Sequence, residues 1–75
     1  MGIAITAARL IPILLRLGFR VVRQVGSHVH LESIGGVARR VTVPMHNKDL
    51  PIATLQSILR QAGISMADFL KILGR

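Results

Sequence analysis

The chain has 75 residues, a net charge of +7 and no cysteine. This length predicts a single domain over residues 1–75, and the lack of cysteine excludes disulfides and thiolate metal sites, which fits the reducing cytoplasm. The positive charge favours a polyanion such as nucleic acid, or an acidic protein, as partner. Within residues 1–40, a single acid, Glu32, stands against six arginines: Arg9, Arg16, Arg20, Arg23, Arg39 and Arg40.

Residues 3–17 are apolar apart from Thr6, Arg9 and Arg16. This run falls short of the roughly 20 apolar residues that a membrane span requires. No basic stretch precedes it, as a secretory signal would need. The segment therefore predicts a core helix of a soluble protein, with no membrane partner.

The first helix is expected to run from an N-cap at Thr6 through Leu17, with its arginines facing outward. Its buried face is a stripe of aliphatic residues. Pro12 is costly deep inside a helix, so the helix either begins near Arg9 or kinks at Pro12. Gly18 suits the position just after the helix. The expected stripe comprises Leu10, Ile13, Leu14 and Leu17.

Three strands are expected next, over residues 19–25, 28–33 and 39–44. Gly26 and Ser27 join the first two as a type II′ turn, because glycine takes a positive φ at the first central position without strain. Opposed residues in this hairpin should have numbers that sum to 53, so that one face carries hydrophobic groups and the other polar ones. The predicted inner face is Val22, Val29 and Leu31, and the predicted outer face is Arg23, His28, His30 and Glu32.

A second helix should begin between Pro51 and Thr54 and end at Gly63, and Ser65 and Asp68 predict the start of a short third helix. The resulting fold class is α+β. Its α-β-β-β-α order is that of the double-stranded-RNA-binding-domain fold, a three-stranded antiparallel sheet with helices on one face. The expected buried residues of these helices are Leu55, Ile58, Leu59, Ala62, Phe69, Leu70 and Leu73.

His28 is the main candidate for catalysis, since it begins a strand directly after the glycine turn and Arg23 lies on the same face. Cleaving RNA requires groups that accept and donate protons, and positive charge to stabilise the phosphorane. An imidazole beside guanidinium groups meets much of that need. The plainer alternative is a surface histidine at a turn. Candidate RNA-binding residues are Arg23, Ser27, His30, Arg39, Arg40 and Lys48.

Several competing interpretations of these residues are weaker. His28, His30 and His46 could hold zinc, but only Glu32 remains as a fourth ligand, so no metal or other cofactor is expected. Lys48 precedes a helix N-terminus, a natural phosphate site, and is equally a solvated lysine beside an aspartate. Nucleophilic catalysis by Ser27 is not supported, because this serine is more simply a turn residue.

The sequence resembles the HicA family of toxins, also called YcfA-like proteins, over about residues 6–73. Gly26-Ser27-His28 alone is a weak signal. It becomes specific together with Val43-Pro44 and the segment from Thr54 to Ser65, which reads TLQSILRQAGIS. The resemblance implies a type II toxin–antitoxin toxin that cleaves mRNA, a dsRBD-like fold and a catalytic histidine at His28.

The resemblance also implies a HicB antitoxin that covers the active surface. Many family members carry a second histidine directly after the catalytic one, whereas this chain has Val29 there and places its extra histidine at His30. The first helix is unusually apolar for the family, so it is a candidate surface for the antitoxin or for a second copy in a homo-oligomer. The alternative function is a non-catalytic double-stranded-RNA-binding module, which would tolerate loss of His28.

Overall fold

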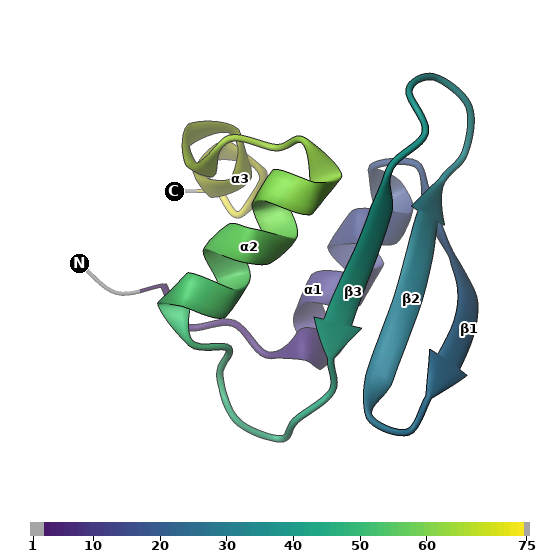
Figure 1. Cartoon of the computed structure of the whole chain (residues 1–75). Coiled ribbons are helices and arrows are strands. Elements are labelled where there is room, and N and C mark those ends of the chain that lie inside the picture. The colour runs from purple at the N-terminus through teal and green to yellow at the C-terminus, as the bar shows by residue number, and fades with distance from the viewer. Residues whose placement is uncertain (1–2, 75) are drawn as a thin grey trace.

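The computed structural model describes residues 3–74, in which helices cover one face of a three-stranded sheet (Figure 1). The expected α-β-β-β-α order is confirmed, followed by the short third helix. The third strand begins at Arg40, one residue later than predicted. The elements are α1 (Ala7–Arg16), β1 (Phe19–Val25), β2 (His28–Ser33), β3 (Arg40–Pro44), α2 (Ile52–Ala62) and α3 (Met66–Ile72).

The strands form an antiparallel meander in the order β1-β2-β3. Gly26 has φ +57°, and no described residue other than glycine has a positive φ. A type I′ turn would need positive φ at Ser27 as well, so this hairpin has the predicted type II′ geometry. The short turn fixes the register next to it, where Val25 pairs with His28 and Arg23 with His30.

The register of the first hairpin changes at Val22, which corrects the sequence prediction. Leu31 pairs with Val21 rather than with Val22, because a β-bulge between Val21 and Arg23 inserts one extra residue into β1. Val22 is 41% exposed and is not a core residue. The rest of the predicted inner face is confirmed, since Val29 and Leu31 are buried.

The first helix, α1, begins at Ala7 rather than near Arg9 and contains Pro12 in its interior. Proline removes the hydrogen bond that would reach the carbonyl of Ala8, but both residues are exposed, so water can satisfy that carbonyl. Thr6 stands at the N-cap position without a capping hydrogen bond from its side chain. Leu17 is 41% exposed because it follows the helix as its C-cap, so its predicted place in the buried stripe is wrong.

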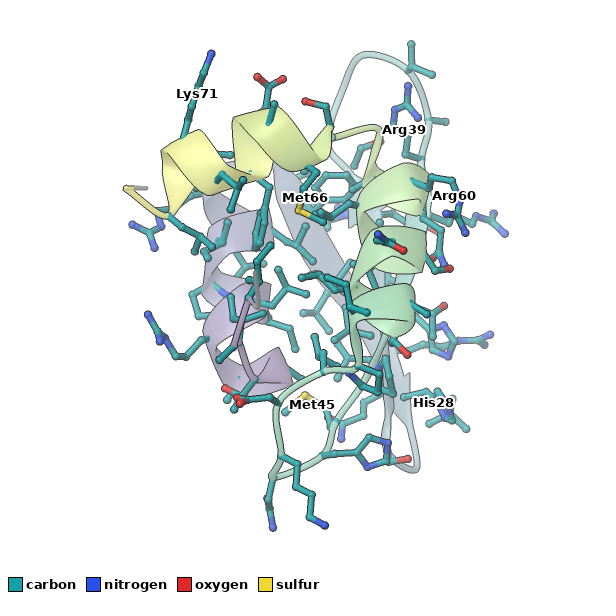
Figure 2. All side chains as sticks on the ribbon, turned by 90° about the vertical axis from the view of Figure 1, so that its left-hand side faces the viewer. His28, Arg39, Met45, Arg60, Met66 and Lys71 are labelled. Atoms are coloured by element: carbon teal, nitrogen blue, oxygen red, sulfur yellow. The ribbon has the colours of Figure 1, made fainter. Side chains whose placement is uncertain are left out.

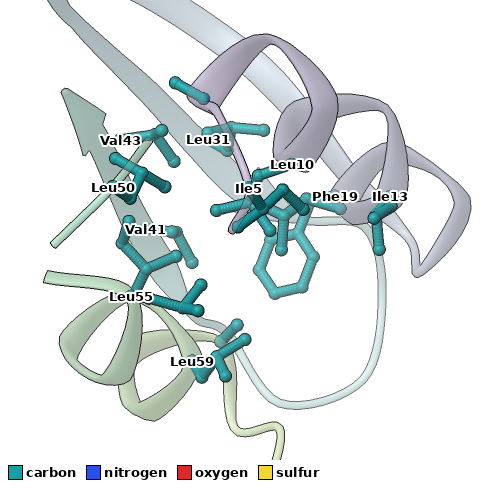
Figure 3. Close-up of a cluster of buried hydrophobic side chains, with 14 of the residues drawn as sticks. Ile5, Leu10, Ile13, Phe19, Leu31, Val41, Val43, Leu50, Leu55 and Leu59 are labelled. Carbon is teal, nitrogen blue, oxygen red and sulfur yellow. The ribbon is translucent and has the colours of Figure 1, made fainter. Parts of the chain in front are cut away.

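The core lies between the inner face of the sheet and the helices, and aliphatic side chains fill most of it (Figure 3). The predicted stripe of α2 is confirmed, and Phe69 of α3 is fully buried. Leu70 of α3 and Leu73 directly after it are only half-buried, contrary to the prediction. The buried residues with the least exposure include Ala7, Leu10, Leu14, Leu31, Val41, Val43, Leu55 and Phe69.

Both ends of the α2–α3 connection follow the predicted capping pattern. Gly63 ends α2 in the left-handed conformation, with φ +73°, and the amide of Ile64 donates to the carbonyl of Leu59. The Oγ of Ser65 accepts a hydrogen bond of 3.1 Å from the amide of Asp68, which caps α3. These two caps fix the direction in which the chain leaves α2 and enters α3.

Helix α2 lies alongside β3 (Figure 1) and satisfies part of its free edge. The amide of Thr42 donates to Oε1 of Gln61 at 3.0 Å, and Nε2 of Gln61 donates to Oγ of Ser57 at 3.3 Å. An amide at a sheet edge that finds a partner within its own chain is less available to other strands. Helices α1 and α2 leave the opposite, outer face of the sheet uncovered.

Among residues 3–74, no helix has the length and apolar character needed to cross a membrane.

Candidate nucleic-acid interface on the outer face of the sheet

His28 begins β2 at the hairpin end of the sheet and is exposed to solvent. Its backbone is held on both sides, because it pairs with Val25 on β1 and with Pro44 on β3. The next amide along, that of Met45, donates to the carbonyl of Ser27. In Figure 2 the His28 side chain points away from the helical core. The ring is therefore presented to solvent from a fixed backbone.

His30 shares the outer face with His28 but is half-buried between neighbouring strands. It pairs with Arg23 on β1 and with Thr42 on β3. Because the amide of Thr42 points to α2, Thr42 and His30 face each other as a non-hydrogen-bonded pair, in which side chains come close. The Nδ1 of His30 is 3.1 Å from Oγ1 of Thr42, so this hydrogen bond sets the orientation of the ring.

Glu32, the next outward residue of β2, is paired with arginines on both neighbouring strands. It lies opposite Arg20 on β1 and Arg40 on β3, and its Oε2 is 3.4 Å from Nε of Arg40. The Arg40 side chain is 88% exposed, so this ion pair adds little to stability. Its effect is to keep one guanidinium group beside the acid while leaving it open to solvent.

A shallow hollow of about 390 Å³ occupies the middle of this face. Residues from all three strands line it, so it exists only in the assembled sheet. The bulge contributes directly, because it places both Val22 and Arg23 at the rim. His28 lies on the same face beyond the lining, toward the hairpin turn. The lining residues are Val22, Arg23, His30, Leu31, Glu32, Arg40, Val41 and Thr42.

The other predicted site residues lie outside this hollow. Arg39 extends to the end of α2, where its guanidinium lies close to Gly63. Ser27 is an exposed turn residue next to His28. Lys48 lines a separate hollow with His46 and other residues of the loop that leads from β3 to α2. Of the predicted residues, the structure thus brings together Arg23, His30 and Arg40, with His28 nearby.

Two further residues, Thr42 and Arg60, were not singled out by the sequence as candidates for the site. The contact of Thr42 with His30 depends on the register of β2 and β3, and the loop between these strands does not specify that register. Arg60 is exposed on α2 and points to the same side as His28 in Figure 2. The sequence could have indicated that Arg60 is exposed, because the helical spacing places it outside the buried stripe of that helix.

The histidines and acids do not assemble a metal site in the described part of the chain. Among residues 3–74, no group of three or more histidine, aspartate or glutamate side chains lies close enough to share an ion. His46 belongs to the loop after β3, whereas His28 and His30 belong to the sheet. The outer face instead combines two imidazoles, several guanidinium groups and one carboxylate, which suits contact with a phosphodiester.

The chain is thus a small α+β domain with a basic sheet face that the helices leave uncovered. A family model described as the HicA toxin of bacterial toxin-antitoxin matches residues 7–64, which run from α1 through the end of α2. The chain belongs to the HicA toxin family. A comparison with curated proteins gave no match.

Proposed function

We propose that this toxin is an endoribonuclease that cleaves mRNA, and that His28 is its catalytic residue. The observation that supports this most is the exposed His28 ring, held at the end of β2 on the face that also carries Arg23 and Arg40. A polyanion can approach this face because the helices lie on the other side. His28 is also the histidine of the Gly-Ser-His motif that the resemblance to HicA toxins assigns to catalysis.

The proposed reaction is attack of a ribose 2′-oxygen on the adjacent phosphorus. A base removes the 2′-hydroxyl proton, the P–O5′ bond breaks, and an acid returns a proton to the leaving 5′-oxygen. The products are a 2′,3′-cyclic phosphate and a 5′-hydroxyl. Arg23 and Arg40 would stabilise the negative charge that develops on the phosphorane, since guanidinium groups pair well with phosphate oxygens.

The protein partner that we propose is a HicB-type antitoxin that covers this same face. A net charge of +7 favours an acidic partner surface, and covering the outer face would block access of RNA to His28. Both the RNA substrate and the antitoxin then compete for one surface. The proposed setting is the cytoplasm, where mRNA is present.

The replacement His28→Ala tests this proposal. We expect it to reduce RNA cleavage by at least about 100-fold, the usual contribution of a proton-transfer group, and to abolish toxicity in cells. The melting temperature should stay close to that of the parent, because the ring is exposed. His46→Ala is the matched control: it removes an exposed histidine from the β3–α2 loop and should leave cleavage unchanged.

Cleavage by His28→Ala at the parental rate would refute the catalytic assignment. The alternative, a non-catalytic double-stranded-RNA-binding module, would instead bind RNA without turnover, with an affinity that falls steeply with salt and does not depend on His28. The basic charge and the α-β-β-β-α order are compatible with that alternative. Incubation of the purified chain with labelled RNA, analysed for products as well as for bound complexes, separates the two.

A further inference from the structure

We infer that His30 is a second catalytic residue, the general acid that protonates the leaving 5′-oxygen, and that Thr42 is its positioning residue. This inference rests on the proposed function, because it concerns the same reaction at the same face. It adds a second histidine to the proposed mechanism, which so far uses His28 alone. Three features of the outer face support it.

The first feature is the spacing of the two rings. His28 and His30 are two residues apart on β2, so both point outward and their Cα atoms are about 7 Å apart. In the proposed reaction the attacking and leaving oxygens lie on opposite sides of the phosphorus. The His28 imidazole can reach the attacking oxygen on one side of a bound phosphate. The His30 imidazole, at this spacing, can reach the leaving oxygen on the other side. The two histidines together can therefore supply both proton transfers.

The second feature is the hydrogen bond between Nδ1 of His30 and Oγ1 of Thr42, at 3.1 Å. A threonine hydroxyl can donate to a neutral ring and accept from a protonated one, because it can rotate. The ring therefore keeps one orientation before and after it loses its proton. The Nε2 atom lies on the far side of the ring and has no protein partner among residues 3–74, so it is free to donate to the substrate.

The third feature is that His30 lines one hollow together with two arginines. Arg23 lies directly opposite it on β1, and Arg40 lies on β3 beside the shared hollow. A phosphate held by these two arginines would lie in the hollow that His30 also lines. The charged and titratable groups that face this ring are Arg23 from β1, His28 and Glu32 from β2, and Arg40 from β3.

The test uses two versions of one short RNA that carries the mapped cleavage site. In the second version the scissile 5′-oxygen is replaced by sulfur, and a thiolate leaves without needing a proton. We expect His30→Ala to cleave the normal RNA about 100-fold more slowly than the parent. On the 5′-thio RNA it should come within about tenfold of the parent. His28→Ala should be impaired on both substrates.

A second variant, His30→Asn, guards against misfolding, since its amide can still meet Thr42 Oγ1 but cannot transfer a proton. It should reproduce the His30→Ala result with an unchanged melting temperature. Normal cleavage of both RNAs by the His30 variants would overturn the inference and leave the proposed function intact. Equal losses on both RNAs would reduce His30 to a binding contact and also overturn it. Failure of the parent to cleave either RNA would instead refute the proposed function.

Discussion

Thr42 connects the outer face of the sheet to helix α2 through two different groups. Its hydroxyl meets the His30 ring, and its amide donates to Oε1 of Gln61. Gln61 is in turn held by Ser57 one turn earlier on the same helix. The orientation of a candidate catalytic ring is thereby linked to the position of a helix that lies on the other side of the strand.

Replacing Thr42 by valine removes the hydroxyl while keeping the shape and the amide. We expect RNA cleavage to fall about fivefold, because the His30 ring loses the partner that fixes its direction, and a lost hydrogen bond is worth about 1 kcal/mol. Thr42→Ser is the conservative control and should retain most of the activity. Rates on a defined RNA, with melting temperatures of both variants, provide the measurement. A Thr42→Val protein as active as the parent would contradict the positioning role.

At the scale of single elements, the end of α2 shows why Arg39 differs from Arg40. The two residues are adjacent, but Arg40 points outward beside Glu32, whereas the Arg39 guanidinium lies close to Gly63. A cation near the last turn of a helix is favourable, because the carbonyl groups there carry partial negative charge. Arg39 therefore has a structural partner, and its predicted role in RNA binding has less support than that of Arg40.

Gly63→Ala should destabilise the fold by about 1 kcal/mol, because alanine is strained at φ +73°. The added methyl group would also meet the Arg39 guanidinium, which must then move. Chemical denaturation of Gly63→Ala in the parental and Arg39→Ala backgrounds separates these two effects. We expect most of the loss to persist without Arg39, since a flexible side chain moves at little cost. An unchanged unfolding midpoint would show that the left-handed conformation is not needed there.

The sequence predicted the elements well where a local signal existed. Gly26 and Gly63 mark the hairpin turn and the helix end, and alternation in β3 separates Val41 and Val43 from their neighbours. The bulge was missed because Val21 and Val22 are consecutive, similar and both exposed, so alternation gives no signal there. The contacts of Thr42 with His30 and Gln61 join segments far apart in the chain, and no local pattern specifies them.

At the scale of the whole molecule, the arginines divide between two faces. Arg9 and Arg16 lie on the exposed side of α1, behind the sheet, while Arg23 and Arg40 lie on its outer face. The high net charge by itself therefore does not say where RNA binds. The outer face is distinguished because Arg23 and Arg40 line one hollow with His30 and Glu32, and His28 lies on the same face.

Substitutions on the two faces should separate specific contacts from overall charge. We expect Arg23→Ala and Arg40→Ala each to weaken RNA binding and to lower the slope of log affinity against log salt by about 1. Arg16→Ala removes the same charge from α1 and should change both quantities much less. Binding titrations at several salt concentrations, with the His28→Ala protein to prevent cleavage, give these slopes. Equal effects on the two faces would indicate that no particular surface binds the RNA.

The extra residue at Val22 has a consequence for how β1 tolerates change in length. Phe19 and Arg23 are four positions apart, so in a regular strand their side chains would point the same way. The irregularity reverses that parity, and one strand can supply both an aromatic side chain to the interior and a cation to the opposite surface. Deleting a single residue here would force a choice between the two. Replacing Val22 by another residue would not force that choice, because the bulge depends on the number of residues in β1 and not on which side chain occupies this position.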